Sequence, residues 1–372
     1  MAMGTGKLKL ALFTAFVAWL SIILSPNILA PPEVPGSHTH LHTAETIHLP
    51  SAFGPESLAF HPNGDGPYTG VADGRVLKWQ GHALGWTDFA FISAPREDCV
   101  QPFAPEMEHI CGRPLGLRFD KKTGDLYIAD AYFGFHVVGP AGGLATQLVT
   151  EVEDQPLYFT NDMDIDEIHD VIYFTDTSSV FRRRQFLPSV LSNDKTGRLL
   201  KYNKSSKEVK VLLRGLAFAN GVSLSKDRSF LLVAESTNCR ILRLWLRGPN
   251  AGNVDVFAEL PGYPDNIRRN NNGEFWVGLH SKKGLLAKVA LSYGWLGRAL
   301  LKLPLSFKQL HSLFVGGKPH GIAVKLGENG EVLQILEDTQ GKTLSFISEV
   351  EEKEGKLWIG SVMTPFIGIY NL

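Results

Sequence analysis

The sequence predicts an all-β protein, a six-bladed β-propeller with a short helical insertion over one face. A short pattern recurs six times, mostly at intervals of roughly 40–60 residues. After most copies come a polar turn and an apolar strand, which is the content of a propeller blade. Composition agrees, because 44% hydrophobic and 20% charged residues are ordinary for a globular domain. The six copies begin at Pro55, Pro114, Thr160, Ala219, Pro264 and Ile347.

The second residue of each copy defines a ring, because equivalent positions of equivalent blades surround one axis. These positions are Glu56, Leu115, Asn161, Asn220, Asp265 and Ser348. Carboxylate and amide oxygens select hard cations, so the ring predicts a Ca²⁺ site, with Mg²⁺ as the other candidate ion. The predicted ligands are Glu56, Asn161, Asn220, Asp265 and the adjacent Asn266. The alternative is that these side chains cap inner strands or bind water in the channel.

The N-terminal segment lies outside the predicted domain. Lys7 and Lys9 precede an apolar run, Leu10–Leu24, and Pro26 follows it. This order indicates a secretory signal over residues 1–30, and an uncleaved signal-anchor is the alternative. Residues 31–44 are expected to be a linker. Either interpretation sends the body to the secretory pathway: endoplasmic reticulum lumen, vacuole or extracellular space. Membrane contact is expected only through this segment, if it is uncleaved.

The predicted propeller covers residues 45–372. Glu45–Leu49 is expected to pair with the C-terminal strand Phe366–Tyr370 and close the ring, which removes the open sheet edges. In the loop before the second copy, an oxidising lumen would favour a bridge between Cys99 and Cys111. The sequon at Asn203 predicts a glycoprotein.

Two segments interrupt the repeats. Residues 177–196 form an insertion in the third blade, and Phe181–Leu191 within it has partly helical spacing. We interpret it as a lid or wall over the ring, since propeller insertions gather on one face, and the alternative is an insertion that only packs on the surface. Ser281–Leu313 is a long apolar excursion expected on the same face. Tyr132 and Phe133 follow an inner strand and are expected either to line the top of the channel or to pack between blades.

The charge balance excludes one class of partner. A formal net charge of −1 gives no electrostatic reason to expect nucleic acid. We expect a monomer that binds a small-molecule substrate. No G-x-S-x-G elbow is present, so a nucleophilic serine is not indicated.

Several motifs resemble the strictosidine synthase-like branch of the six-bladed propellers, a superfamily that includes paraoxonases, gluconolactonases and adipocyte plasma membrane-associated protein. The resemblance covers nearly the whole chain after about Glu45. It implies a Cys99–Cys111 bridge, a secretory or vacuolar address and the calcium ligands named above. The motifs are Cys111–Gly116, Leu199–Tyr202, Phe218–Gly221, Tyr263–Ile267 and, most like the plant proteins, Ser189–Arg198.

Two departures from the relatives bear on function. Strictosidine synthase uses one Glu in its last blade, and Ser348 occupies that position here. Glu349 is adjacent, but neighbouring strand residues point to opposite faces, so we expect it to face away from the ring. Paraoxonases use a histidine pair, and the matching positions are Leu115 and about Ala131.

The sequence therefore predicts a calcium-dependent ester or lactone hydrolase of the arylesterase type rather than a strictosidine synthase. Asp265 is the candidate general base. The predicted substrate pocket consists of Leu115, Tyr132, Phe133, Phe181 and Ser348. Two alternatives stay open: a non-catalytic binding protein with a structural calcium, and a synthase that condenses an amine with an aldehyde in alkaloid-type metabolism. Whether the protein is an enzyme is left open by the sequence.

Overall fold

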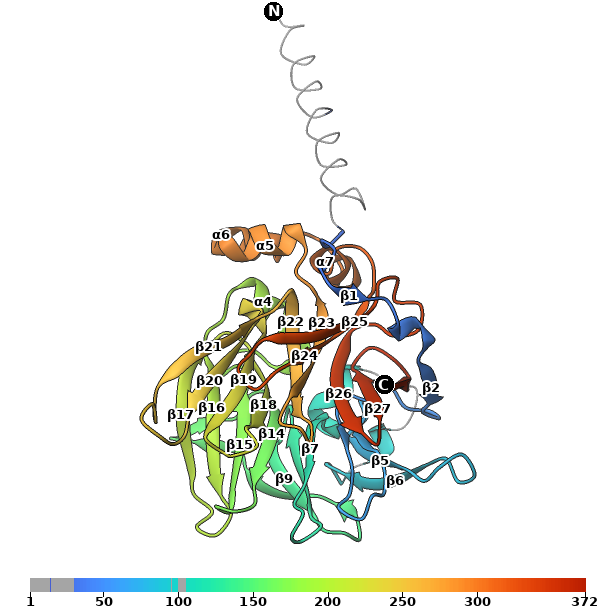
Figure 1. The fold of residues 1–372 in the computed structure, drawn as a ribbon, viewed down its shortest axis with the longest axis vertical. Coiled ribbons are helices and arrows are strands. Elements are labelled where there is room, and N and C mark those ends of the chain that lie inside the picture. Colours follow the sequence, from blue (N-terminus) through green and yellow to red (C-terminus); the bar gives the residue numbers. More distant parts are fainter. Residues whose placement is uncertain (1–13, 15–29, 95, 100–104) are drawn as a thin grey trace, which may run out of the picture.

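Six sheets surround a central axis in the computed structural model, which describes residues 14, 30–94, 96–99 and 105–372 (Figure 1). The predicted six-bladed propeller is confirmed. Most of the predicted signal segment, residues 1–30, lies outside the described residues. Among the residues that are described, no helix is long and apolar enough to cross a bilayer.

Each blade is an antiparallel sheet whose first strand lies nearest the axis. The first blade contains β3 (Leu58–Ala59), β4 (Tyr68–Gly70), β5 (Arg75–Trp79) and β6 (Trp86–Phe91). The second contains β7 (Pro114–Phe119), β8 (Leu126–Asp130), β9 (Gly134–Val138) and β11 (Thr146–Val149). The third contains β14 (Thr160–Asp166), β15 (Val171–Asp176), β16 (Gly197–Asn203) and β17 (Val209–Leu216). The fourth and fifth contain β18 (Ala219–Leu224), β19 (Phe230–Glu235), β20 (Arg240–Trp245) and β21 (Val254–Glu259); β22 (Gly262–Arg269), β23 (Phe275–Lys282), β24 (Gly321–Leu326) and β25 (Val332–Asp338). The sixth contains β26 (Ile347–Lys353), β27 (Lys356–Ser361), β28 (Phe366–Asn371) and β2 (Glu45–His48). Short additional strands are β10 (Gly143–Leu144), β12 (Glu151–Val152) and β13 (Gln155–Pro156).

The first and last parts of the propeller meet in the sixth blade. β2 pairs antiparallel with β28, with Glu45 opposite Ile369, so the predicted closure is confirmed. The fold also begins earlier than expected. β1 (Ser37–His38) pairs with β25, and Leu41 is fully buried beside Trp276. Part of the predicted linker 31–44 is therefore built into the propeller, because burying Leu41 removes an apolar side chain from water.

Apolar side chains fill the space between neighbouring blades. Phe135 of the second blade stacks on Phe174 of the third, with ring centroids 4.9 Å apart. Similar clusters join each blade to the next. Because each sheet buries both faces this way, the second strand of a blade, such as β8, β15 or β19, is a nearly continuous apolar run.

Helices cover one end of the ring. They are α4 (Phe186–Leu191), which follows a short 3₁₀ turn at Arg183–Gln185, and then α5 (Leu285–Ser292), α6 (Gly294–Leu300) and α7 (Phe307–Phe314) (Figure 1). Pro188 is accommodated in α4 because it lies in the first turn, where its missing N–H has no partner to lose. One apolar cluster joins α4 to α5 and α7. The insertion 177–196 is thus helical, as predicted, and packs on the residue 281–313 segment.

The predicted bridge between Cys99 and Cys111 is confirmed. Cys99 and Cys111 form a disulfide with Cα atoms 5.6 Å apart, and Cys239 is a buried free thiol. The remaining short helices are 3₁₀ turns at Leu41–Thr43, Glu97–Cys99, Pro105–Met107 and Ser236–Asn238, and α3 (Glu108–Cys111).

Candidate functional site

A β-bulge near the start of the inner strands sets the geometry of the axis. In β14 the pairing register shifts between Thr160 and Met163, and the other long inner strands shift at the corresponding place. A bulge breaks the strict alternation of side chains, so two consecutive residues can both reach the channel. This is how Asn161 and Asp162 both contribute to it.

A cavity opens at the helical end of the axis. Its floor includes all four predicted oxygen ligands of the ring, and Leu115 lines it beside them. The walls are mostly apolar and come from several blades and from the helical insertions. The remaining lining side chains include Phe159, Phe186, Val190, Phe218, Tyr263 and Phe314. The equivalent positions of four repeats therefore line the same cavity. We call these residues the oxygen ring: Glu56, Asn161, Asn220 and Asp265.

The amide oxygens of the oxygen ring lack hydrogen-bond partners. The Asn161 amide donates from Nδ2 to Thr177 Oγ1 at 2.9 Å, and Asn220 donates to Ser236 Oγ at 3.1 Å. Oδ1 of each is buried and accepts no hydrogen bond, and Glu56 Oε2 is in the same state. Buried acceptors without a donor are costly, whereas a cation would satisfy all three.

The carboxylates of the ring also lack a contacting cation among the described residues. Burial, reinforced by Asp265, raises the pKa of Glu56 to about 8. Burial raises the pKa of Asp265 to about 7, although a hydrogen bond from Asn220 lowers it. A bound divalent ion would reverse this balance and favour both charged forms. The donor set, two carboxylates and two or three amide oxygens, fits Ca²⁺. Within the described part of the chain, no three His, Cys, Asp or Glu side chains cluster as metal ligands, so the amides are needed.

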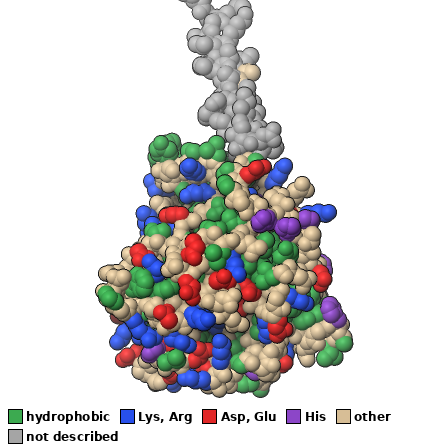
Figure 2. Space-filling view, in the orientation of Figure 1, with side chains coloured by type: hydrophobic (Ala, Val, Ile, Leu, Met, Phe, Trp, Pro, Cys, Tyr) green, Lys and Arg blue, Asp and Glu red, His purple; other side chains and the backbone are tan. Residues whose placement is uncertain are grey.

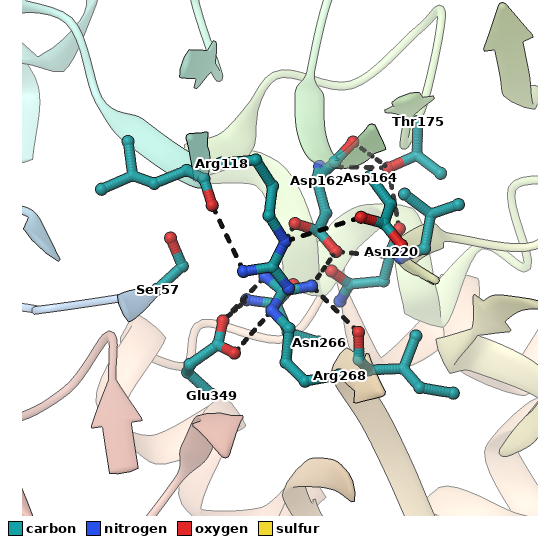
Figure 3. Close-up of polar contacts among 12 residues, drawn as sticks. Ser57, Arg118, Asp162, Asp164, Thr175, Asn220, Asn266, Arg268 and Glu349 are labelled. Carbon is teal, nitrogen blue, oxygen red and sulfur yellow. Dashed lines mark hydrogen bonds and ion pairs between the residues drawn. The ribbon is translucent and has the colours of Figure 1, made fainter. Parts of the chain in front are cut away.

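A charged cluster closes the channel beneath the ring (Figure 3). Arg268 donates to both oxygens of Asp162, at 2.6 and 2.8 Å, and to Glu349 Oε2 at 2.7 Å. All three side chains are buried. Although burial lowers it, the two carboxylates raise the pKa of Arg268 well above its usual value. We call Asp162, Arg268 and Glu349 the lower cluster.

Asn266 connects the two layers. Its Nδ2 donates to Glu56 Oε1 and to Glu349 Oε2, each at 3.1 Å, while its Oδ1 is buried and unpartnered. The predicted ligand Asn266 therefore lies behind the oxygen ring and does not line the cavity.

Glu349 differs from the prediction. It does not face away from the channel but turns inward, where Asn266 and Arg268 hold it. The reason is the register shift between Ile347 and Glu349, which breaks the alternation on which the prediction relied. Ser348 instead donates from Oγ to the Glu56 backbone oxygen at 2.6 Å.

Four of the five predicted pocket residues lie elsewhere. Tyr132 and Phe133 border a separate surface hollow with Arg182, Arg184 and Gln185, because the chain turns outward after β8. Phe181 precedes the helical turn of the insertion and lies outside the cavity lining. Ser348 is occupied by its contact with the neighbouring strand. This corrects the predicted lining, of which only Leu115 remains.

Three polar residues of the cavity lining were not predicted: Ser236, which accepts the Asn220 hydrogen bond, and two titratable residues, Arg183 and His280. Arg183 lines the cavity, and its Nη1 contacts Glu108 Oε1 at 2.6 Å. His280 also lines it, with Nε2 3.0 Å from His311 Nε2 of α7. Burial and His311 lower the pKa of His280 well below its usual value, and burial lowers that of His311 to about 4. His280 lies in β23 directly after the buried residues Phe275–Leu279, so a polar side chain after an apolar run was a signal that the sequence offered.

Comparison with known proteins now identifies the family. The strictosidine synthase family model matches residues 161–249, and the model of the strictosidine synthase-like N-terminal region matches residues 38–79. Strictosidine synthase-like protein 10 of Arabidopsis thaliana is 65% identical over 364 residues, which cover 96% of this chain and 97% of the relative. The chain belongs to the strictosidine synthase-like family. Strictosidine synthase-like protein 3 of the same plant is 49% identical, with 93% of this chain and 90% of the relative covered.

Solved structures support the fold of this strictosidine synthase-like chain. A gluconolactonase from Xanthomonas campestris aligns with a TM-score of 0.58 at 14% identity and covers 92% of this chain and 98% of that one. Regucalcin from Agrobacterium tumefaciens, described as a calcium-binding protein, aligns with a TM-score of 0.55 at 12% identity, covering 88% and 93%. At such identities the likeness shows the propeller architecture alone.

Proposed function

We propose that this strictosidine synthase-like protein is a calcium-dependent hydrolase of esters or lactones. One observation carries the proposal: buried, unpartnered oxygens from separate blades meet two carboxylates at the floor of an apolar cavity. Glu56, Asn161, Asn220 and Asp265 would hold the ion, with Asn266 behind them, and Mg²⁺ is the second ion that such oxygens accept.

The cavity walls support a substrate that is largely apolar. Phe159, Phe218 and Tyr263 can pack against its hydrocarbon part and exclude water, which strengthens every electrostatic interaction at the floor. When bound, calcium would polarise the substrate carbonyl and stabilise the oxyanion that develops on it. One fold neighbour is named a gluconolactonase and another a calcium-binding protein, and both labels agree with this chemistry.

Asp265 is the proposed general base. Its carboxylate lies at the cavity floor, and a bound divalent ion would keep it in the charged form that accepts a proton. The carboxylate accepts a proton from a water molecule whose oxygen forms a bond to the carbonyl carbon. The ester C–O bond then breaks, and the leaving oxygen receives the proton back from Asp265. The net reaction adds one water across the ester or lactone bond.

The test uses purified protein with Ca²⁺, phenyl acetate and a panel of lactones. We expect turnover that chelation removes and that Asp265→Ala abolishes. Glu208→Gln, at an exposed carboxylate on β16–β17, serves as the matched control and should retain full activity. Unchanged turnover in Asp265→Ala would overturn the mechanism. If chelation lowers the melting temperature while no substrate is hydrolysed, the calcium is structural and the protein is a binding protein.

A second candidate function is favoured by the inward turn of Glu349. A synthase that condenses an amine with an aldehyde needs a channel carboxylate from the last blade. Strictosidine synthase activity itself is not expected, because Ser348 occupies the synthase position. Incubation with tryptamine and small aldehydes, followed by mass spectrometry, tests this function. A product that disappears in Glu349→Gln would support it.

The secretory address, a glycan at Asn203 and a monomeric state remain predictions that accompany this proposal. Asn203 ends β16 and accepts backbone hydrogen bonds from Ser205 and Ser206 in an exposed turn, which leaves its amide nitrogen accessible to glycosylation.

A further inference from the structure

Residues 283–318, which contain the helices α5, α6 and α7 and which we call the cap, expose large apolar side chains at one end of the molecule. Trp295 is 65% exposed, Tyr293 59% and Leu285 52%, and Figure 2 shows hydrophobic side chains gathered over this end. Exposed apolar side chains are rarely so concentrated on the surface of a soluble protein. Such a patch indicates a site that binds another surface. Its other members are Val289, Leu303 and Phe307.

The charges of the cap all have one sign. Between Glu274 and Glu328 the sequence contains no aspartate or glutamate, although the whole chain is nearly neutral. Among the described residues none of the cap's basic side chains forms an ion pair, and most are exposed. They are Lys283, Lys288, Arg298, Lys302, Lys308 and Lys318. A surface that combines exposed apolar groups with unpaired cations complements an anionic layer above an apolar one.

The aromatic residues of the cap indicate that the anionic layer is the headgroup region of a lipid bilayer. Trp and Tyr concentrate at the headgroup level of bilayers, because their rings are apolar and their N–H and O–H groups stay hydrated. Tyr293 and Trp295 stand at the junction of α5 and α6, flanked by Lys288 and Arg298. This order of residue types matches an interfacial helix pair.

The course of the chain supports the same orientation. β1 pairs with β25 beside α7, so the polypeptide enters the propeller at the cap end (Figure 1). The apolar run Leu10–Leu24 precedes β1 by a short segment in the sequence. A bilayer that held an uncleaved N-terminal segment would therefore lie on the cap side of the propeller.

The cap is also continuous with the cavity. Phe307 of α7 packs edge-on against Phe186, a cavity-lining residue of α4, with centroids 5.6 Å apart. Phe314 at the other end of α7 lines the cavity itself. A surface bound through the cap would lie next to the entrance used by apolar ligands.

We propose that the cap docks on an anionic lipid bilayer. Leu285, Val289, Tyr293 and Trp295 enter the interface, and the surrounding lysines and Arg298 contact the headgroups. The opposite mouth of the propeller, at the turn between β14 and β15, faces away from the lipid.

The experiment uses the full chain with one environment-sensitive fluorophore. Trp295→Cys is labelled with a nitrobenzoxadiazole dye, and Ile168→Cys, 66% exposed in the β14–β15 turn, is the matched control. The native cysteines do not compete, because two are bridged and Cys239 is buried. Both proteins are mixed with vesicles of phosphatidylcholine alone or with one-third phosphatidylserine. We expect a blue shift and quenching by brominated lipid at position 295 only, and more strongly with phosphatidylserine.

A charge-reversal variant tests the headgroup contact. Lys288→Glu, Arg298→Glu and Lys302→Glu together should raise the vesicle concentration needed for the shift at position 295 at least about tenfold. The control reverses Lys210, Lys226 and Lys356, which are exposed away from the cap, and should leave it unchanged. Equal responses at positions 295 and 168, or a water-exposed label at 295 in phosphatidylserine vesicles, would overturn the proposal.

Discussion

The oxygen ring and the lower cluster are adjacent layers of one channel, yet they differ in whether a cationic side chain contacts their buried carboxylates. In the lower cluster Asp162 and Glu349 both contact the guanidinium of Arg268. In the oxygen ring Glu56 and Asp265 contact no cationic side chain among the described residues, and neighbouring amide oxygens are unpartnered. The lower layer carries its own counter-charge, which is typical of a structural element. The upper layer leaves that charge to a ligand, which is typical of a binding site.

The strongest test of the lower layer removes its cation. Arg268→Met leaves Asp162 and Glu349 buried without a counter-charge, so we expect a loss of about 3–5 kcal/mol in the free energy of unfolding. Chemical denaturation followed by fluorescence measures it. A triple variant that adds Asp162→Asn and Glu349→Gln should recover much of the loss. Wild-type stability in Arg268→Met would remove the distinction between the layers.

The matching change in the upper layer should spare the fold and remove the response to metal. Glu56→Gln keeps the shape of the side chain and deletes one of two ring charges. In wild type, Ca²⁺ at 100 times its dissociation constant should stabilise the fold by about 2.7 kcal/mol. We expect this increment to vanish in Glu56→Gln, while stability in a chelator stays at or above that of wild type. Melting curves with Ca²⁺ and with chelator give both values, and a retained calcium increment would contradict the assignment.

The pH dependence follows from the raised pKa values of Glu56 and Asp265, about 8 and 7 without metal. Below these values the metal-free site holds protons that Ca²⁺ must displace, so calcium affinity falls as pH falls, by about tenfold or more per unit below pH 7. The stability of the metal-free protein depends on pH in the opposite direction. Because the folded state binds more protons than the unfolded chain above pH 4.5, its stability falls as pH rises towards 8. Calorimetric titration from pH 8 to pH 6 checks the affinity, and a flat profile would exclude these carboxylates as ligands.

The smallest effect is expected at the open end of the channel. Arg118 lies 3.9 Å from Asp164 and 3.7 Å from Glu351, with its side chain partly exposed. Water can replace such contacts, so Arg118→Met should cost less than about 1 kcal/mol. The same denaturation assay, run beside Arg268→Met, makes the comparison. Equal losses in the two variants would show that burial does not set the importance of these ion pairs.

The parts that sequence reasoning predicted are those that repeat. Six copies of one pattern predicted the blades, and their register placed Glu56, Asn161, Asn220 and Asp265 together. Arg268 was missed because, as a single cation, it leaves no periodic signal. The inward turn of Glu349 depends on a bulge, whose extra residue does not alter the hydrophobic pattern. The cavity walls come from insertions such as α4 and α7, whose packing is set by tertiary contacts rather than by period.

The pairing of β2 with β28 has a consequence for how the protein is made. The sixth blade joins residues 45–48 to residues 366–371, so the ring stays an open arc until β28 has been synthesised. During that time both terminal blades present unpaired strand edges, on which other nascent chains could add. Production of this protein should therefore depend on chaperones that shield strand edges, and deletion of the final strand should yield aggregates rather than a smaller propeller.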